Sequence, residues 1–374
     1  MKLTRREALS LLGASAAIPF RSPERLALLK REPVRSAESL ALQRTSPFER
    51  GAVIRTVLND VPPEAVNGAV LFHEHLSIRY PLTRALAEKA GRPVPVSFTD
   101  DVDLMVEETR AAGREGIGCI VDGGHPDMDR DLAALRRIAN ESGVRIVASG
   151  GFYLQRNYPP DLAAKSADQI ADELVRDARD QRLGAFGEIG QQGGVLTDDE
   201  KKVFTAVGKA QARSGLPIFT HNAYTGVRTV DPPVPMDAAL KQLDVLDAAG
   251  ANPKHVAIGH VCCLDDPKAE VAKQLAKRGV FVGFDRVTLG VIIPDEKRVS
   301  MILAFLDAGY ADHLLLSSDF ATGRALKKNG GPGIAQTKTA FGPMLVKAGV
   351  SEATLTKILN DNSRQFLAVV PKNG

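Results

Sequence analysis

Six side chains that could bind a divalent metal ion each stand at the end of a short apolar run. They are four imidazoles and two carboxylates: His73, His75, Glu188, His221, His260 and Asp319. Imidazole nitrogens combined with carboxylate oxygens suit divalent metals of the zinc class. A single four-coordinate site needs fewer than six ligands, so the set predicts two metal ions. Without such cations, these acids and bases would lack partners if they were buried together.

The apolar runs that carry these residues have the length of β-strands buried on both faces. Each holds four to six apolar or small residues, and amphipathic helical patterns lie between them. There are eight such runs, at residues 69–75, 116–124, 144–153, 184–190, 216–222, 255–263, 280–287 and 313–320.

The helical patterns between the runs have recognisable ends. One opens with the capping box Thr197-x-x-Glu200 and closes at Gly215, and another opens at Asp266 and closes at Gly279. Strands that alternate with helices indicate parallel βαβ units, and eight units most simply close into an α/β fold of the (β/α)8 TIM barrel type. A doubly wound open sheet is the alternative, but its GxGxxG turn after the first strand is missing.

The carboxyl ends of all strands in a parallel barrel share one rim, where barrel enzymes keep their active sites. Side chains alternate along a strand, so we expect His73 and His75 to face the barrel axis together and Glu74 to point away. A lone histidine at a strand end is more often a hydrogen-bonded structural residue than a ligand. Six candidate ligands at one rim favour the metal site. His125, after the second strand, is expected to support the loop or a ligand rather than bind metal.

The amino terminus has a different character from the body. Arg5 and Arg6 precede a weakly apolar segment at 8–18, which predicts a twin-arginine signal over residues 1–20 and a periplasmic or secreted location. A basic terminus without a targeting role is the alternative. The segment is too short for stable membrane insertion. Residues 21–50 are predicted to form a linker or flexible arm, and residues 51–370 a single-domain barrel.

Charge is concentrated in the same leader. Residues 1–55 hold 11 Lys and Arg against 5 Asp and Glu, whereas the whole chain has a formal charge of +3. The body is therefore slightly acidic and lacks the basic stripe that nucleic-acid binding requires. Cys119, Cys262 and Cys263 have no metal-binding or disulfide spacing, and we interpret them as packing residues.

The order of the motifs HEH, GEIG, THN, IGH and SSD resembles the phosphotriesterase family of the amidohydrolase superfamily. The likeness extends over about residues 50–370 and is nearest to the phosphotriesterase homology or phosphotriesterase-related branch, in which a glutamate on the fourth strand bridges two metals. The resemblance implies that His73, His75 and Asp319 hold the more buried metal, that His221 and His260 hold the more exposed one, and that Glu188 bridges them. It also implies a hydroxide nucleophile between the metals, with Asp319 as the general base.

Other positions bear on the substrate. Cys263 stands near the place of an acidic proton relay in phosphotriesterase itself, so we expect only weak triester hydrolysis. By its likeness to related lactonases, Arg286 is expected to hold a carbonyl or carboxylate, with a salt bridge to Asp285 as the alternative. Tyr153 is a second substrate-binding candidate by family position. Zinc is the expected metal, with manganese, iron or cobalt as alternatives, and family members often form homodimers.

These observations predict a metal-dependent hydrolase of the EC 3.1 type that attacks an ester, lactone or related carbonyl of a small molecule. Two alternatives remain open. One is an amidase acting on N-acyl amino acid-like substrates, with Arg286 as the carboxylate anchor, and the other is a non-catalytic periplasmic barrel that binds a metal or ligand. The glycine-rich segment 321–338 is expected to act as a mobile lid.

Overall fold

The computed structural model describes residues 46–79, 81–226, 233–288, 290 and 292–372. By its internal contacts the chain divides after Pro47, and the description below concerns the unit Phe48–Gly374. The predicted signal at 1–20 and most of the predicted arm at 21–50 lie outside the described residues.

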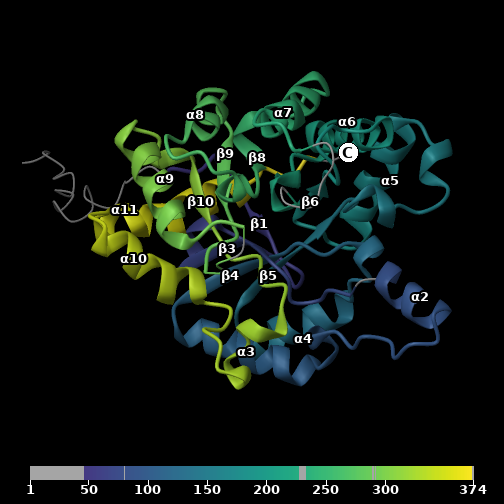
Figure 1. Ribbon diagram of the computed structural model, residues 1–374, viewed down its shortest axis with the longest axis horizontal. Helices are drawn as coiled ribbons and strands as arrows, with labels where there is room; N and C mark the ends of the chain where they lie inside the picture. The colour runs from purple at the N-terminus through teal and green to yellow at the C-terminus, as the bar shows by residue number, and fades with distance from the viewer. Residues whose placement is uncertain (1–45, 80, 227–232, 289, 291, 373–374) are drawn as a thin grey trace, which may run out of the picture. The chain divides into compact units, whose positions relative to one another are not determined.

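Eight parallel strands form one sheet in the middle of this unit (Figure 1). They neighbour one another in chain order, from the first to the last strand, and all their pairings are parallel. The nearly closed barrel confirms the predicted (β/α)8 architecture. The strands are β3 (Ala69–Glu74), β4 (Ile117–Asp122), β5 (Arg145–Gly150), β6 (Ala185–Gly190), β7 (Ile218–His221), β8 (Val256–Ile258), β9 (Phe281–Phe284) and β10 (Leu314–Leu316). A short antiparallel hairpin, β1 (Ile54–Arg55) with β2 (Asp60–Val61), precedes them.

Helices connect the strands and lie around the sheet (Figure 1). They are α2 (Pro81–Lys89), α3 (Val102–Arg114), α4 (Leu132–Ser142), α5 (Ala167–Asp180), α6 (Asp198–Ser214), α7 (Ala238–Ala248), α8 (Glu270–Lys277), α9 (Asp295–Asp307), α10 (Gly342–Lys347), α11 (Glu352–Thr356) and α12 (Ser363–Leu367). Two π-helical segments, η12 (Thr337–Phe341) and η13 (Lys357–Asn362), run directly into α10 and α12.

The predicted ends are right for α6, and for α8 the predicted close at Gly279, which has a φ of 84°, is right but the predicted start is wrong. Thr197 and Glu200 form the expected reciprocal capping box of α6, and Gly215 closes that helix with a φ of 79°. The helix α8 begins at Glu270 rather than at Asp266. Asp266 instead accepts the backbone N–H of Ala269 in a tight turn, and its side chain accepts the N–H of Val271. The Asp266 cap is therefore separated from the helix by a turn that the pattern does not reveal.

Apolar side chains inside the barrel form a core separate from the one beneath the helices. The inner core includes Val70, Phe72, Phe219 and Leu315, all fully buried. Phe366 on α12 joins them, with ring centroids 6.2 Å from Phe72 and 5.8 Å from Phe281. The carboxyl-terminal helix therefore supplies part of the barrel interior.

Two strands break the inward and outward alternation just before the rim. The register between β3 and β4 shifts between Leu71 and Glu74, and that between β6 and β7 shifts between Phe186 and Ile189. An irregularity of this kind redirects the side chains that follow it. Phe72 belongs to the inner core, yet the adjacent His73 also packs there, with its ring centroid 5.0 Å from that of Phe219.

The segment predicted to be a mobile lid, residues 321–338, packs against α3 in this structure. Leu326 and Ile334 are buried. The backbone N–H of Lys327 donates to Glu108 over 2.7 Å, and its ammonium pairs with Glu115 at the same distance. Buried apolar side chains and two hydrogen bonds to glutamates hold this segment in the described conformation. Its action as a lid stays a prediction.

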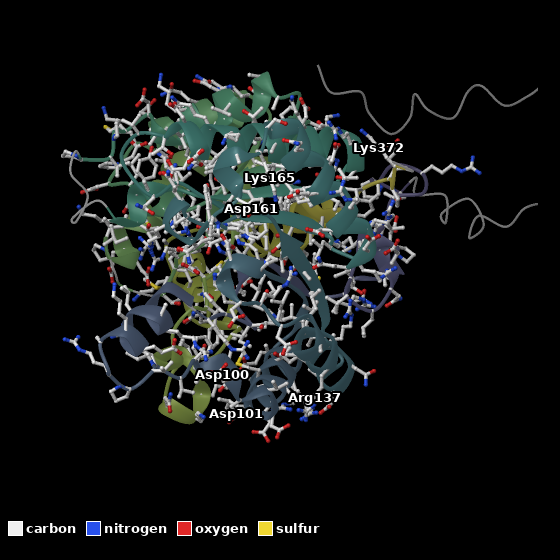
Figure 2. All side chains as sticks on the ribbon, turned by 90° about the vertical axis from the view of Figure 1, so that its right-hand side faces the viewer. Asp100, Asp101, Arg137, Asp161, Lys165 and Lys372 are labelled. Carbon is white, nitrogen blue, oxygen red and sulfur yellow. The ribbon has the colours of Figure 1, made fainter. Side chains whose placement is uncertain are left out.

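Charged side chains cover the outer helices (Figure 2). Lys165 pairs with Asp161 at 2.8 Å and with Glu173 at 2.9 Å, and Arg137 pairs with Glu141 at 2.7 Å. Exposed pairs of this kind each contribute about 0–1 kcal/mol to stability. Within the described part of the chain, no helix is long and apolar enough to cross a membrane.

We predict that Phe366→Ala destabilises the barrel by about 3–5 kcal/mol, because it removes a fully buried ring that touches two others and leaves a cavity. Urea denaturation followed by circular dichroism measures this loss. Val96→Ala is the control, since Val96 is 82% exposed and its truncation should change the free energy of unfolding by less than about 0.5 kcal/mol. Equal, small losses in the two variants would contradict the assignment of Phe366 to the core.

Candidate metal centre

The structure brings all six predicted ligands together where the strands end. His73, His75, Glu188 and Asp319 form one group whose ligand atoms all lie within 4.8 Å of one another. Glu188, His221 and His260 form a second group by the same criterion. Glu188 belongs to both groups and so lies between them, as the binuclear interpretation requires.

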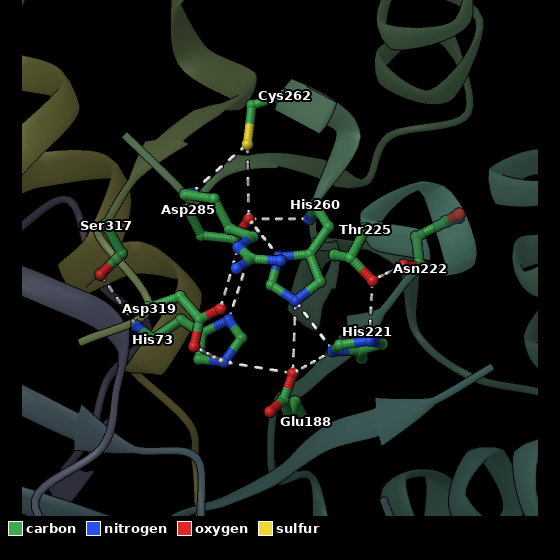
Figure 3. A network of polar contacts seen from close by, with 12 residues as sticks. His73, Glu188, His221, Asn222, Thr225, His260, Cys262, Asp285, Ser317 and Asp319 are labelled. Atoms are coloured by element: carbon green, nitrogen blue, oxygen red, sulfur yellow. Dashed lines mark hydrogen bonds and ion pairs between the residues drawn. The ribbon is translucent and has the colours of Figure 1, made fainter. Parts of the chain in front are cut away.

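Glu188 contacts all four imidazoles of the candidate ligand set, and Figure 3 shows it beside three of them, His73, His221 and His260. Its Oε2 lies 2.6 Å from His221 Nδ1, 3.3 Å from His260 Nε2 and 3.4 Å from His73 Nε2. Its Oε1 lies 3.3 Å from His75 Nε2. This carboxylate is 2% exposed, so the two groups of ligands share one buried negative charge.

Three imidazoles are held by the nitrogen that faces away from the centre (Figure 3). Asp285 bridges two of them, with Oδ2 2.8 Å from His73 Nδ1 and Oδ1 2.9 Å from His260 Nδ1. Thr225 Oγ1 lies 3.2 Å from Nε2 of His221. Because a carboxylate only accepts hydrogen bonds, Asp285 keeps the proton on both Nδ1 atoms and leaves both Nε2 atoms free to bind metal.

Asp285 is the functional residue that sequence reasoning misjudged. The sequence suggests only a salt bridge between Asp285 and Arg286. In the structure Asp285 pairs with His73 and His260, and Arg286 Nε pairs with Asp319 Oδ2 at 3.2 Å. The signal was present, because Asp285 follows an apolar run directly, as the six predicted ligands do.

Two of the ligand residues have left-handed backbone conformations, with φ of 56° at His260 and 50° at Asp319. Such conformations cost residues other than glycine about 1–3 kcal/mol and persist only where the surroundings hold them. At His260 the backbone N–H donates to Asp285 Oδ1 over 2.7 Å. The same carboxylate thus fixes both the backbone and the ring of this residue.

Gly123, just after β4, allows the close approach of the histidine pair. A Cβ at this position would lie 3.1 Å from His75 Cε1 and 3.2 Å from His73 Cδ2. These distances are shorter than ordinary van der Waals contact. Its carbonyl also accepts the backbone N–H of Glu188 over 3.3 Å. A side chain here would displace two imidazoles.

Opposite charges outweigh burial at several groups of the centre, whereas at His221 burial outweighs Glu188 and lowers the pKa. Burial lowers the pKa of His75, but Asp319 and Glu188 raise it to about 9 overall. Burial likewise lowers the pKa of His260, and Asp285 and Glu188 raise it to about 9. Burial opposes the charge of Glu188, yet His221 and His73 hold its pKa well below the usual range. The carboxylates stay charged and demand positive charge nearby, which a divalent cation can supply.

An unpaired nitrogen supports the same conclusion. Among the described residues, Nε2 of His73 is buried and has no hydrogen-bond partner, although it faces the carboxylates of Glu188 and Asp319 at 3.4 and 4.0 Å. A buried polar atom without a partner is costly. The donor set of imidazole nitrogens and carboxylate oxygens therefore fits a pair of divalent metal ions in its chemistry, its burial and its unmet need for a cation.

Both predicted substrate-binding residues border this centre. Arg286 is 20% exposed at its side chain and contacts Asp319. The ring of Tyr153 packs edge-on against that of His221, with centroids 4.9 Å apart. A guanidinium and a phenol thus each contact one residue of the candidate ligand set.

His125 and the cysteines lie outside the two ligand groups. His125 Nδ1 lies 3.0 Å from Asp127 Oδ1, and Asp127 Oδ2 accepts the backbone N–H of Tyr153 over 2.8 Å. His125 therefore supports the loop that carries Tyr153, as expected. Cys262 and Cys263 are buried free thiols, and Cys262 Sγ accepts the backbone N–H of Arg286 over 3.3 Å.

Comparison with known proteins places this arrangement among relatives. The protein-family model described as "Phosphotriesterase family" matches residues 53–367 of this chain. The phosphotriesterase homology protein of Escherichia coli (strain K12) is 29% identical over 312 residues, covering 80% of this chain and 97% of that protein. The N-acetyltaurine hydrolase of Bos taurus is 28% identical over 353 residues, covering 84% of this chain and 97% of that protein.

Solved structures agree with the sequence comparison. The crystal structure of the Escherichia coli protein, which contains phosphate in its active site, is similar with a TM-score of 0.69 and 27% identity, covering 81% of this chain and 99% of that chain. A lactonase from Listeria monocytogenes is similar with a TM-score of 0.70 and 23% identity, covering 84% and 98% of the two chains. At that identity the second likeness concerns the fold alone.

We predict that Asp285→Asn weakens metal binding by about 10- to 100-fold. The asparagine oxygen can serve His260, which donates twice to the same Oδ1, but the NH2 group then faces His73 Nδ1 and forces that nitrogen to accept. The proton moves to Nε2, which can no longer bind metal. Competition with a chromophoric chelator measures the affinity. Asp266→Asn is the control, because it alters a buried carboxylate that caps α8. It should leave the metal affinity unchanged.

Proposed function

This chain belongs to the phosphotriesterase family, and we propose that it is a binuclear metal-dependent hydrolase of small-molecule carbonyl compounds. The bond attacked is an ester, a lactone or a related carbonyl, with weak hydrolysis of phosphotriesters as a side activity. The observation that carries this proposal is the convergence of two groups of metal-binding side chains on the shared carboxylate of Glu188.

The residues divide naturally between two metal ions. His73, His75 and Asp319 would hold one ion, His221 and His260 the other, and Glu188 would bridge them. Two divalent cations, when bound, lower the pKa of water to near neutrality and polarise a carbonyl oxygen. Zinc is the proposed metal, although manganese, iron and cobalt accept the same donor set.

Asp319 is the proposed general base. Burial disfavours its charge, but His75 and the Arg286 guanidinium outweigh that effect and hold its pKa below the usual range. The carboxylate is therefore ionised at neutral pH, with Oδ1 3.1 Å from His75 Nε2 and Oδ2 3.2 Å from Arg286 Nε. It can take a proton from the attacking water and pass it on, while Arg286 keeps it oriented.

A second candidate function is hydrolysis of an acyl amide that carries an acidic group. Arg286 favours it, because a guanidinium beside the catalytic carboxylate can bind a carboxylate or sulfonate of the substrate. The bovine relative is named for hydrolysis of N-acetyltaurine, an amide with a sulfonate. Both candidates use the same centre and differ in the leaving group and in the group that Arg286 contacts.

We predict that Asp319→Asn lowers kcat by about 10²- to 10⁴-fold while two metal ions per chain remain bound, because the amide keeps an oxygen ligand and loses the base. A screen of lactones, aryl esters, acyl amides and triesters identifies the substrate, and elemental analysis counts the metals. Asp265→Asn is the control, since Asp265 is 51% exposed and pairs with Lys297. Unchanged turnover in Asp319→Asn would refute the mechanism, and fewer than two metals at full loading would refute the binuclear centre.

We predict that Arg286→Gln separates the two candidate functions. It should raise KM for an anionic acyl amide about tenfold or more, by removing a charge-assisted hydrogen bond, and leave KM for an uncharged lactone unchanged. The kcat should fall equally for both substrates, since Arg286 also contacts Asp319. Steady-state kinetics on the two substrates measure this split. A parallel rise of both KM values would show that Arg286 does not recognise the acidic group.

A further inference from the structure

Glu74, between the two histidines of the first strand, is fully buried, and the described residues show its carboxylate accepting four hydrogen bonds. Oε1 accepts from Ser317 Oγ over 3.0 Å and from Ser318 N over 2.9 Å. Oε2 accepts from Ser318 Oγ and Phe320 N, both over 2.8 Å. All four donors belong to one segment, residues 317–320, which follows the last strand.

Residues 317–320 include Asp319, and they lie beyond the end of strand β10, where the regular pairing of the sheet has ended. The strand β10 ends at Leu316, and Asp319 has a left-handed backbone. The residues on either side, Ser318 and Phe320, both donate their backbone N–H groups to Glu74. The N–H of Asp319 itself donates to the carbonyl of His73 over 3.2 Å. Three consecutive peptide groups are thus bound to β3 or to its side chain.

We propose that Glu74 is a positioning residue that holds Asp319 in the conformation required of a metal ligand and general base. This inference rests on the proposed function of Asp319. Glu74 contacts neither metal ion nor substrate in this scheme. It acts by fixing the backbone of Asp319, and thereby the direction of a carboxylate that must reach His75 and Arg286 at once.

Glutamine has the same shape as glutamate but cannot take its place. The two oxygens of Glu74 each face one backbone N–H, from Ser318 and Phe320 respectively. Whichever way the amide of a glutamine is turned, its NH2 group meets one of these N–H groups at hydrogen-bonding distance, donor against donor. Backbone N–H groups cannot rotate away as a hydroxyl can. One of the two peptide groups beside Asp319 must therefore move.

The test compares Glu74→Gln with Glu108→Gln in the full chain. Glu108 is also a buried glutamate that accepts a backbone N–H, from Lys327, but it lies on α3 and outside the metal centre. We expect Glu74→Gln to lower kcat by about 10- to 100-fold with KM unchanged. We also expect a changed visible absorption spectrum of the cobalt-loaded protein, because Asp319 is displaced as a ligand. Glu108→Gln should preserve both the kcat and the spectrum.

Ser318→Ala serves as a milder variant, since it removes only the hydroxyl donor to Oε2. It should show a smaller fall in kcat and a smaller spectral change, and it decides the question if Glu74→Gln does not fold. The proposal would be overturned if Glu74→Gln had the same kcat and the same cobalt spectrum as the parent protein. If Glu74→Gln does not fold, the same result in Ser318→Ala would overturn it. So would equal losses of kcat in Glu74→Gln and Glu108→Gln, which would indicate general destabilisation.

The cobalt spectrum also separates this proposal from the proposed function. If the parent protein binds cobalt but hydrolyses none of the screened substrates, the hydrolase assignment fails, and a spectral change in Glu74→Gln still supports the positioning of Asp319. If the parent protein hydrolyses a substrate and Glu74→Gln matches it in both readouts, only the positioning role fails. If the parent protein binds no cobalt, Asp319 is not a ligand and the positioning proposal is overturned.

Discussion

The buried carboxylate of Glu188 is the group on which the rest of the structure depends. It touches four imidazoles and is almost wholly removed from water. A charge in that position is tolerated only where opposite charge and hydrogen bonds surround it. The barrel meets this demand because all eight strands end at the same rim, so each can deliver one polar side chain to a common point. The barrel thus supplies, at one rim, the opposite charges that this buried carboxylate requires.

Two further buried carboxylates support the strained parts of this centre. Asp285 binds the backbone and ring of His260, and Glu74 binds the backbone on both sides of Asp319. His260 and Asp319 are the two ligands with left-handed backbones. The fold thus places a carboxyl group that accepts hydrogen bonds beside each unfavourable conformation, and these hydrogen bonds offset its cost. Neither supporting residue needs to touch a metal ion to determine where the ligands lie.

The strands and the candidate ligands were predictable because each has a local sequence signal. A strand is indicated by a short apolar run, and a candidate ligand by the polar residue at the end of that run. The inward direction of His73 and His75 was also predictable from alternation. The register shifts within which His73 and Glu188 lie were not, because alternation alone does not reveal them. The role of Asp285 was missed because its nearest charged neighbour in sequence, Arg286, turns to Asp319 instead. The start of α8 was misplaced because Asp266 caps across a turn. Each error concerns backbone geometry or a partner distant in sequence, which residue types do not encode locally.

The hydrogen bonds of Glu74 join residues that are far apart along the chain, with sequence separations of 244 for Ser318 and 246 for Phe320. Contacts at such separations close large loops, and closing a larger loop costs more chain entropy. These hydrogen bonds form only where the first and last strands of the barrel meet. Where these strands are apart, Glu74 cannot hold the backbone of residues 317–320, and the group of candidate ligands lacks Asp319. The integrity of the candidate centre therefore depends on the closure of the barrel.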